Sequence, residues 1–139
     1  MHRVHQATLS VATQGRSFTN VTSDVARVVE GARVSVGLCT VFLRHTSASL
    51  VVQENADPAV LRDLAAWMDR IAPESAAYEH DAEGPDDMPS HIRSAVTKTS
   101  ESIPVTGGKL ALGTWQGLYV WEHRRAAHTR HLVVHVAGE

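Results

Sequence analysis

Residues 34–54 read VSVGLCTVFLRHTSASLVVQE, and this stretch decides the fold. Val34 to Arg44 is an apolar run with the length of a buried strand, and Ser49 to Glu54 is a second one. The residues between them, His45 to Ala48, are mostly polar and predict a turn. The stretch therefore predicts two apolar strands that are joined by a polar turn.

The segments on either side carry further strand and helix patterns. Apolar and polar side chains alternate over residues 5–13, which is typical of a strand with one buried face. Asp57 followed by Pro58 is a strong helix start, because aspartate caps a helix and proline fits its first turn. The same patterns predict the remaining elements: a helix from Thr19 or Asn20 to Gly31, a helix from Asp57 to Pro73, a short helix at 90–97, and strands at 102–105, 109–113, 118–122 and 131–136.

The chain has no internal repeat and no linker that would divide it. Its 139 residues suit one domain and are enough to bury a sizeable core. Strands interrupted by a few helices are typical of the α+β class. We therefore expect a single domain over residues 1–139, with mainly antiparallel sheets that form a β-sandwich-like core with two or three helices.

Composition excludes several classes of partner and site. The formal net charge is −2 and no basic block occurs, which argues against nucleic acid or an anionic membrane as the main partner. The single cysteine, Cys39, excludes an internal disulfide and a cysteine-rich zinc site, and we expect it to be buried. No signal-peptide pattern or membrane span is present, so we expect a cytoplasmic protein. Nine histidines instead suggest a metal site or acid–base chemistry.

Well-known catalytic motifs are absent. The sequence has no GxGxxG, no GxSxG and no HExxH. Thr106 to Lys109 lacks the upstream glycine and the following hydroxyl residue of a phosphate-binding loop, and it predicts a hairpin turn instead. Nucleotide hydrolysis, serine hydrolysis and zincin chemistry therefore lose their motif support.

Three polar clusters remain as candidate sites. In the first, His45 ends a strand and is followed by the hydroxyl residues Thr46, Ser47 and Ser49. Hydroxyls and turn N–H groups at a strand end can hold an oxyanion or a phosphate. A turn that is merely capped by serine and threonine side chains is an equally good interpretation.

The second cluster runs from His80 to His91 through an acidic loop that contains Glu83, Asp86 and Asp87. Neutral imidazoles suit Zn, Ni, Fe or Mn, and a carboxylate can complete the ligand set. A solvated acidic loop would explain the carboxylates alone. Long irregular loops in compact domains are, however, usually functional.

The third cluster is Gly113-Thr114-Trp115-Gln116-Gly117 with the strand that follows it. Its glycines allow a ligand or a neighbouring chain to approach the backbone. Glu122 stands at the end of an apolar strand face, so it needs a partner, of which an arginine is the simplest. We expect Trp115 to pack or to contact another subunit, and His131 and His135 to face solvent or an interface.

Taken together, the motifs resemble those of the YjbQ-like family, small bacterial and archaeal proteins often labelled secondary thiamine-phosphate synthase enzymes. The resemblance runs in order over nearly the whole chain, and the segments DDMPSHI and GTWQ are its most specific parts. The motifs that carry it are Arg44-His45-Thr46-Ser47-Ala48-Ser49-Leu50, Asn55-Ala56-Asp57-Pro58, Tyr78-Glu79-His80-Asp81, residues 83–92 and Leu112-Gly113-Thr114-Trp115-Gln116-Gly117.

The resemblance implies an α+β fold, a homotrimer with metal-associated sites, and weak coupling of hydroxymethylpyrimidine diphosphate with thiazole phosphate. His45, His80 and His91 lie in the family's motifs and become the metal candidates, with Zn or Mg as the divalent metal and a small phosphorylated molecule as the partner. The acidic candidates for catalysis are Glu122, Asp86 and Asp87. The candidates for substrate binding are Thr46, Ser47, Ser49, Thr114, Gln116 and Arg124.

Two alternatives to this transferase stay open. One is a non-catalytic trimer that binds a metal or a small phosphorylated metabolite, since the sequence supplies no clear nucleophile. The other is a metal-dependent hydrolase with Glu122 or a carboxylate of the acidic loop as its base.

Overall fold

A computed structural model describes all residues from 1 to 139. It has eight strands and three helices, in accord with the predicted α+β class. In chain order they are β1 (Arg3–Thr13), β2 (Phe18–Asn20), α1 (Thr22–Ala32), β3 (Val36–Leu43), β4 (Ala48–Glu54), α2 (Pro58–Ile71), α3 (Asp87–Ala95), β5 (Ser100–Thr106), β6 (Lys109–Leu110), β7 (Gln116–Glu122) and β8 (His128–Gly138).

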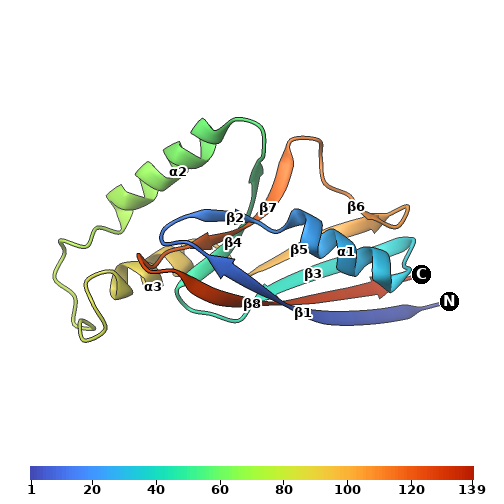
Figure 1. Cartoon of the computed structure of the whole chain (residues 1–139), viewed down its shortest axis with the longest axis horizontal. Coiled ribbons are helices and arrows are strands. Elements are labelled where there is room, and N and C mark those ends of the chain that lie inside the picture. Colours follow the sequence, from blue (N-terminus) through green and yellow to red (C-terminus); the bar gives the residue numbers. More distant parts are fainter.

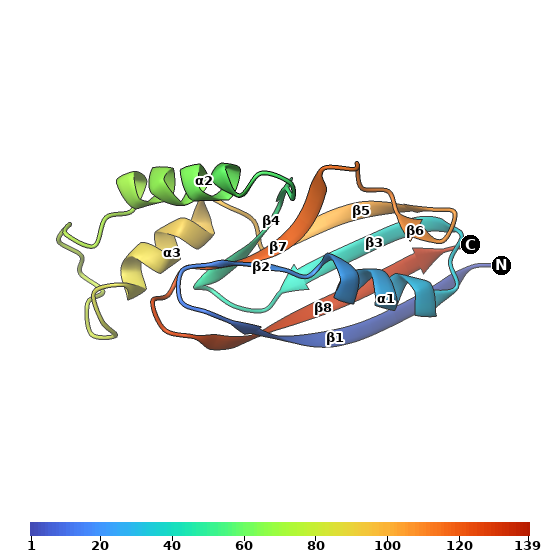
Figure 2. The ribbon, with the colours of Figure 1, turned by 45° about the horizontal axis from the view of Figure 1, so that its top comes forward.

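The strands form two antiparallel sheets. The larger sheet has the order β1-β8-β3-β5-β6, and the smaller has the order β2-β7-β4. Both chain termini lie at one end of the molecule, whereas α2, α3 and the loop between them lie at the other (Figures 1 and 2). The two strands that residues 34–54 predict are β3 and β4, and they belong to different sheets.

The core lies between the two sheets and α1. Nineteen buried apolar side chains form one cluster, in which Val25, Val28 and Val29 of α1 share one helix face. Cys39 is fully buried in this cluster, as predicted, and burial raises the pKa of its thiol to about 11. The opposite face of the larger sheet is open, and on it Val36, 65% exposed, lies in line with Leu38 and Phe42.

Both faces of β7 are buried. Leu118 and Val120 belong to the main core, while Tyr119 and Trp121 point to the other side of the strand. There the ring of Phe18 in β2 stacks on Trp121 with centroids 4.5 Å apart. The end of β7 therefore carries its polar residues, Glu122 and those that follow, into the interior rather than into solvent.

Element boundaries differ from the predicted ones at three points. Strand β2 precedes α1 where a helix cap was expected, and α1 continues past Gly31 to Ala32. Arg33 then ends α1 in the left-handed region, with φ 54°. Helix α3 begins at Asp87, three residues before the predicted start, because Pro89 fits within the first turn of a helix as well as before it.

Other predicted features are confirmed. Asp57 caps α2 by accepting a hydrogen bond from the Ala59 backbone N–H at 2.9 Å. The turn between β5 and β6 is a hairpin, and Gly107 and Gly108 both have positive φ there. The longest helix, α2, has 14 residues, and no helix combines the length and the apolar character that a membrane crossing requires.

Candidate functional site

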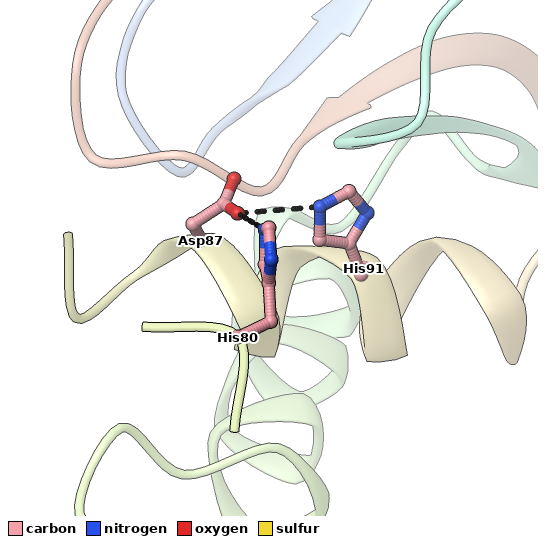
Figure 3. Close-up of side chains that lie close together, drawn as sticks. All are labelled: His80, Asp87 and His91. Carbon is pink, nitrogen blue, oxygen red and sulfur yellow. Dashed lines mark hydrogen bonds and ion pairs between the residues drawn. The ribbon is translucent and has the colours of Figure 1, made fainter. Parts of the chain in front are cut away.

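Two imidazoles and a carboxylate converge at the end of the molecule that carries α3. Asp87 Oδ2 lies 2.8 Å from His80 Nε2 and 3.3 Å from His91 Nε2 (Figure 3). One possible ligand atom from each residue lies within 4.8 Å of those of the other two. We call His80, Asp87 and His91 the histidine cluster.

Local sequence explains how these three residues meet. Asp87 and His91 are four residues apart on α3, so both side chains project from one face of the helix. His80 comes from the irregular loop that precedes α3. The loop turns back through Gly84, whose φ of 106° is unfavourable for residues with a side chain.

Arg124, just beyond β7, holds the carboxylates of this end in place. Its Nε donates to Asp86 Oδ2 at 2.9 Å, and its NH1 group donates to Asp87 Oδ1 at 2.7 Å. Its NH2 group donates to the Glu83 carbonyl oxygen at 3.0 Å. Arg124 thus occupies one oxygen of Asp87, and the other oxygen is directed at the two histidines.

The charges of the histidine cluster support one another. Burial alone would raise the pKa of Asp87, but the hydrogen bond from His80 and the charges of His91 and Arg124 lower it overall. The pKa of His80 is raised, mainly by its hydrogen bond to Asp87 and also by Glu83, whose Oε2 lies 3.0 Å from His80 Nε2. Asp87 is therefore ionised at neutral pH and favours a positive charge beside it.

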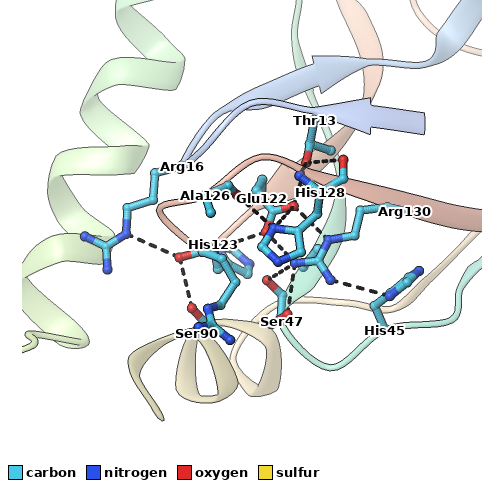
Figure 4. Close-up of polar contacts among 12 residues, drawn as sticks. Thr13, Arg16, His45, Ser47, Ser90, Glu122, His123, Ala126, His128 and Arg130 are labelled. Atoms are coloured by element: carbon cyan, nitrogen blue, oxygen red, sulfur yellow. Dashed lines mark hydrogen bonds and ion pairs between the residues drawn. The ribbon is translucent and has the colours of Figure 1, made fainter. Parts of the chain in front are cut away.

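A second polar group lies deeper, where β7 and β8 meet. Glu122 is fully buried, and Arg130 Nε donates to its Oε1 at 2.7 Å. Thr13 Oγ1 donates to the same oxygen at 2.7 Å, and the Arg124 backbone N–H donates to the other at 3.1 Å. Arg130 also donates to Ser47 Oγ at 2.9 Å (Figure 4). We call Thr13, Ser47, Glu122 and Arg130 the buried network.

The buried network confirms the ion pair that was predicted for Glu122, and it argues against a role of Glu122 as a catalytic base. Burial alone would raise the pKa of this carboxyl, but hydrogen bonds from Arg130 and Thr13 lower it overall. A carboxylate that is fully buried and accepts four hydrogen bonds has no free oxygen for a substrate. Its role is to hold β1, β7 and β8 together.

His45 lies with the buried network and not with the histidine cluster. Its Nε2 accepts a hydrogen bond from the His131 backbone N–H at 2.9 Å, and its Nδ1 faces Arg130 at 3.4 Å. Burial and the charge of Arg130 lower the pKa of His45. Within the chain the predicted trio of His45, His80 and His91 is therefore divided, and Asp87 takes the place of His45 beside the other two.

A buried histidine connects α3 to the smaller sheet. His123 Nε2 lies 2.8 Å from Ser49 Oγ, and Ser90 Oγ of α3 donates to the His123 carbonyl oxygen at 2.9 Å. Burial, together with the charge of Arg93, lowers the pKa of His123 to about 3. His123 is therefore neutral, and Ser49 serves this contact rather than an exposed substrate site.

The other predicted substrate residues do not form one site within the chain. Ser47 is engaged by Arg130, Arg124 is engaged by Asp86 and Asp87, and Thr46 is exposed. Thr114 and Gln116 lie at the opposite end of β7 from Glu122, about 20 Å away along a seven-residue strand. Of the three acidic candidates, only Asp87 reaches the histidine cluster, while Asp86 accepts hydrogen bonds from Arg124 and Arg125.

Sequence reasoning missed Thr13, His123 and Arg130, and it gave Asp87 a catalytic role rather than a ligand role. The spacing of Asp87 and His91 was the available signal, because residues four apart face each other on a helix. That signal required α3 to begin at Asp87. No local pattern shows the contact of Thr13 with Glu122, which spans 109 residues of sequence.

Comparison with known proteins places the chain among relatives. The family model described as UPF0047 protein YjbQ-like matches residues 7–139. The UPF0047 protein sll1880 of Synechocystis sp. is 57% identical, over 99% of this chain and 94% of that protein. The UPF0047 protein YjbQ of Escherichia coli O157:H7 is 41% identical, over 97% of this chain and 99% of that protein.

Solved structures agree with the sequence comparison. An uncharacterized conserved protein of the YjbQ/UPF0047 family from Clostridium acetobutylicum superposes with a TM-score of 0.84 at 35% identity, over 91% of this chain and 97% of that one. A YbjQ-like protein of unknown function from Sulfolobus solfataricus P2 superposes with a TM-score of 0.92 over both whole chains, and at 24% identity it shows the shared fold. The chain therefore belongs to the YjbQ-like family, UPF0047.

Proposed function

We propose that this protein is a metal-dependent enzyme in which His80, Asp87 and His91 hold a divalent transition metal. The observation that carries the proposal is the convergence of two imidazoles and one carboxylate from a loop and one helix face. Two histidines and a carboxylate are a common donor set for Zn, Fe and Mn. Mg prefers oxygen ligands, so this donor set favours Zn over Mg.

The distances within the histidine cluster support the proposal. Two donor atoms that each lie about 2.1 Å from a tetrahedral ion are about 3.4 Å apart. The separation of Asp87 Oδ2 and His91 Nε2 is 3.3 Å, close to this value. His80 Nε2 is at hydrogen-bond distance from Asp87 and needs to move outward by only a few tenths of an ångström.

Chain residues around the cluster would prepare and orient the ligands. Arg124 fixes Asp87 through the oxygen that faces away from the histidines. His91 is one-third exposed and His80 is half-exposed, so a substrate can approach from the solvent side. A bound divalent ion would supply Lewis acidity and neutralise negative charge that develops on a leaving group.

The specific reaction that the family resemblance implies is the coupling of hydroxymethylpyrimidine diphosphate with thiazole phosphate, and we propose it as the first activity to test. Loss of diphosphate in this reaction calls for a divalent cation. The phosphate groups would depend on that cation, because Arg124 already donates to Asp86, Asp87 and Glu83.

We further propose that the chain assembles as a homotrimer through the open face of the larger sheet. Val36, Leu38 and Phe42 lie along this face in one line on β3, and each is at least 45% exposed. Exposed apolar side chains in line on an uncovered sheet are typical of a subunit contact. Light scattering that gives the mass of three chains would support this assembly, and the mass of one chain would contradict it.

Metal content tests the site directly. The purified protein, exchanged against Zn²⁺ and freed of excess metal, should retain one ion per chain by mass spectrometry. His91→Ala should lose that ion, whereas His2→Ala, which changes an exposed histidine near the N-terminus, should retain it. Unchanged metal content in His91→Ala would overturn the proposed site.

Activity separates the candidate reactions. Thiamine phosphate formed from both precursors by the zinc-loaded protein, and absent with His91→Ala, would support the transferase. Hydrolysis of a phosphatase or esterase substrate that depends on the same histidine would support the metal-dependent hydrolase. Metal retention with neither activity would favour a non-catalytic binding protein.

A further inference from the structure

A hollow of about 430 Å³ opens beside His80 in the loop between α2 and α3. Its wall includes the side chains of Tyr78, His80 and Met88. The remaining lining residues are Glu74, Ala76, Ala77, Asp81, Gly84 and Pro85. Because the hollow lies against one member of the histidine cluster, an inference about its ligand rests on the proposed function and names the kind of group that this site accepts.

No lysine or arginine lines the hollow, and the arginines nearby are engaged elsewhere. Arg16 and Arg125 both pair with Glu74, on the wall of the hollow. Arg124 uses all three of its nitrogens on Asp86, Asp87 and Glu83. An anionic group in the hollow would therefore find no free cationic side chain.

The loop carries an excess of negative charge. Between Glu74 and Met88 the sequence has six carboxylates: Glu74, Glu79, Asp81, Glu83, Asp86 and Asp87. Only three arginines pair with them, Arg16, Arg124 and Arg125. Three negative charges are therefore left over, and a divalent ion in the histidine cluster would not neutralise all of them.

The shape of the hollow adds to this charge. The hydroxyl of Tyr78 donates to the Pro73 carbonyl oxygen at 2.6 Å, which fixes the ring as part of the wall. Met88 offers a polarizable thioether on the same wall. Asp81 is exposed at the rim, and its carboxylate makes no ion pair within the chain. A fixed aromatic ring and a free carboxylate are the groups that bind organic cations.

We infer that the hollow accepts the cationic, nitrogen-bearing group of a small organic molecule while the histidine cluster acts on another part of it. Tyr78 and Met88 contact the apolar carbon atoms around the nitrogen, and Asp81 contributes the opposite charge. The hollow thereby selects against substrates whose organic part is anionic.

Choline and its uncharged isostere 3,3-dimethyl-1-butanol test the inference, because they share shape and differ in charge. Met88 provides the readout: the chain has three methionines, so the ¹³C-labelled methyl signals can be assigned by substitution. In the zinc-loaded full-length protein, choline should shift the Met88 signal and leave that of the buried Met68 unchanged. The isostere should bind at least fivefold more weakly, and acetate should not shift Met88.

Two variants locate the charge. Asp81→Asn should weaken choline binding about fivefold, whereas Asp63→Asn, which removes an exposed carboxylate from α2, should leave it unchanged. Tyr78→Leu should weaken choline more than the isostere, because leucine keeps the apolar contact and loses the aromatic face. Both variants differ from wild type at residues outside the histidine cluster, so each should retain zinc.

The outcomes separate this inference from the proposed function. A choline-dependent shift of Met88 in a protein that retains no zinc would support the hollow and overturn the metal site. Equal binding of choline and its isostere in a protein that retains zinc would overturn the hollow alone. A shift of Met88 by acetate that exceeds the shift by choline would overturn it as well.

Discussion

The histidine cluster and the buried network lie at the same end of β7 and are built from the same kinds of side chain, yet they differ in what is left free. In the buried network Glu122 is fully buried, and its oxygens accept hydrogen bonds from Thr13, Arg130 and the Arg124 backbone. In the histidine cluster Asp87 has one oxygen fixed by Arg124 and the other shared by two partly exposed histidines.

Arg124 joins the two regions. Its backbone N–H donates to Glu122, and its side chain donates to Asp87. Groups with every donor and acceptor satisfied stabilise the fold, whereas groups with free donors beside solvent are available for ligands. The comparison teaches that hydrogen-bond saturation, rather than residue type, separates structural carboxylates from functional ones in this protein.

The largest effect is expected from breaking the buried ion pair. Arg130→Met leaves Glu122 buried without its partner, and loss of one member of such a pair costs about 3–5 kcal/mol of the free energy of unfolding. Urea denaturation measures it. The double variant Arg130→Met with Glu122→Gln should be less destabilised than the sum of the single ones. A loss below about 1 kcal/mol for Arg130→Met would show that the network does not stabilise the fold.

The next effect concerns pH and His123, which lies between the two regions. Its pKa is about 3 in the folded state and 6.5 as an ordinary histidine, so between these values the unfolded chain binds a proton that the folded chain does not. Stability should therefore fall as pH decreases below 6.5, by about 1.4 kcal/mol per pH unit from this group. In His123→Gln, denaturation at pH 6.5 and pH 5 should show a shallower pH dependence. An unchanged slope would contradict a neutral buried His123.

A smaller effect is expected from Arg124, which orients a ligand without contacting the ion. Arg124→Gln should lower zinc affinity about 10–100-fold, as is typical when a group behind a metal ligand is removed. Competition with a chromogenic chelator measures it. Arg125→Gln is the matched control, because the Arg125 side chain pairs with Glu74 and not with Asp87. Equal losses in both variants would mean that Arg124 acts only through the general charge of the loop.

The smallest effect is expected at Glu83. Its carboxylate lies 3.0 Å from His80 Nε2 but is 63% exposed, and exposed ion pairs contribute little. Glu83→Gln should change zinc affinity less than about threefold in the same competition assay. A loss comparable to that of Arg124→Gln would make Glu83 a further ligand and would extend the histidine cluster to four residues.

Sequence patterns predicted most of the fold because its strands and helices carry regular apolar spacing. The alternation in β1, the cap at Asp57 and the hairpin at Gly107 and Gly108 are local features, and each is confirmed. The short strand β2 was missed because three residues are too few to show a period.

The candidate site was predicted only in part. His80 and His91 were chosen for their acidic loop, and the structure brings them together. His45 was grouped with them because its motif is also polar, although a contact with Arg130 across 85 residues places it elsewhere. Asp87 was assigned another role because the start of α3 was placed too late. Distances through space between distant segments decide such sets, and sequence spacing does not contain them.

Anomalous X-ray diffraction at the zinc absorption edge, from crystals of the zinc-exchanged protein, tests the central claim most directly. We predict one peak per chain within about 2.3 Å of His80 Nε2, Asp87 Oδ2 and His91 Nε2. No peak at these atoms, or a peak at His45 beside the buried network instead, would contradict the assignment of the histidine cluster as the metal site.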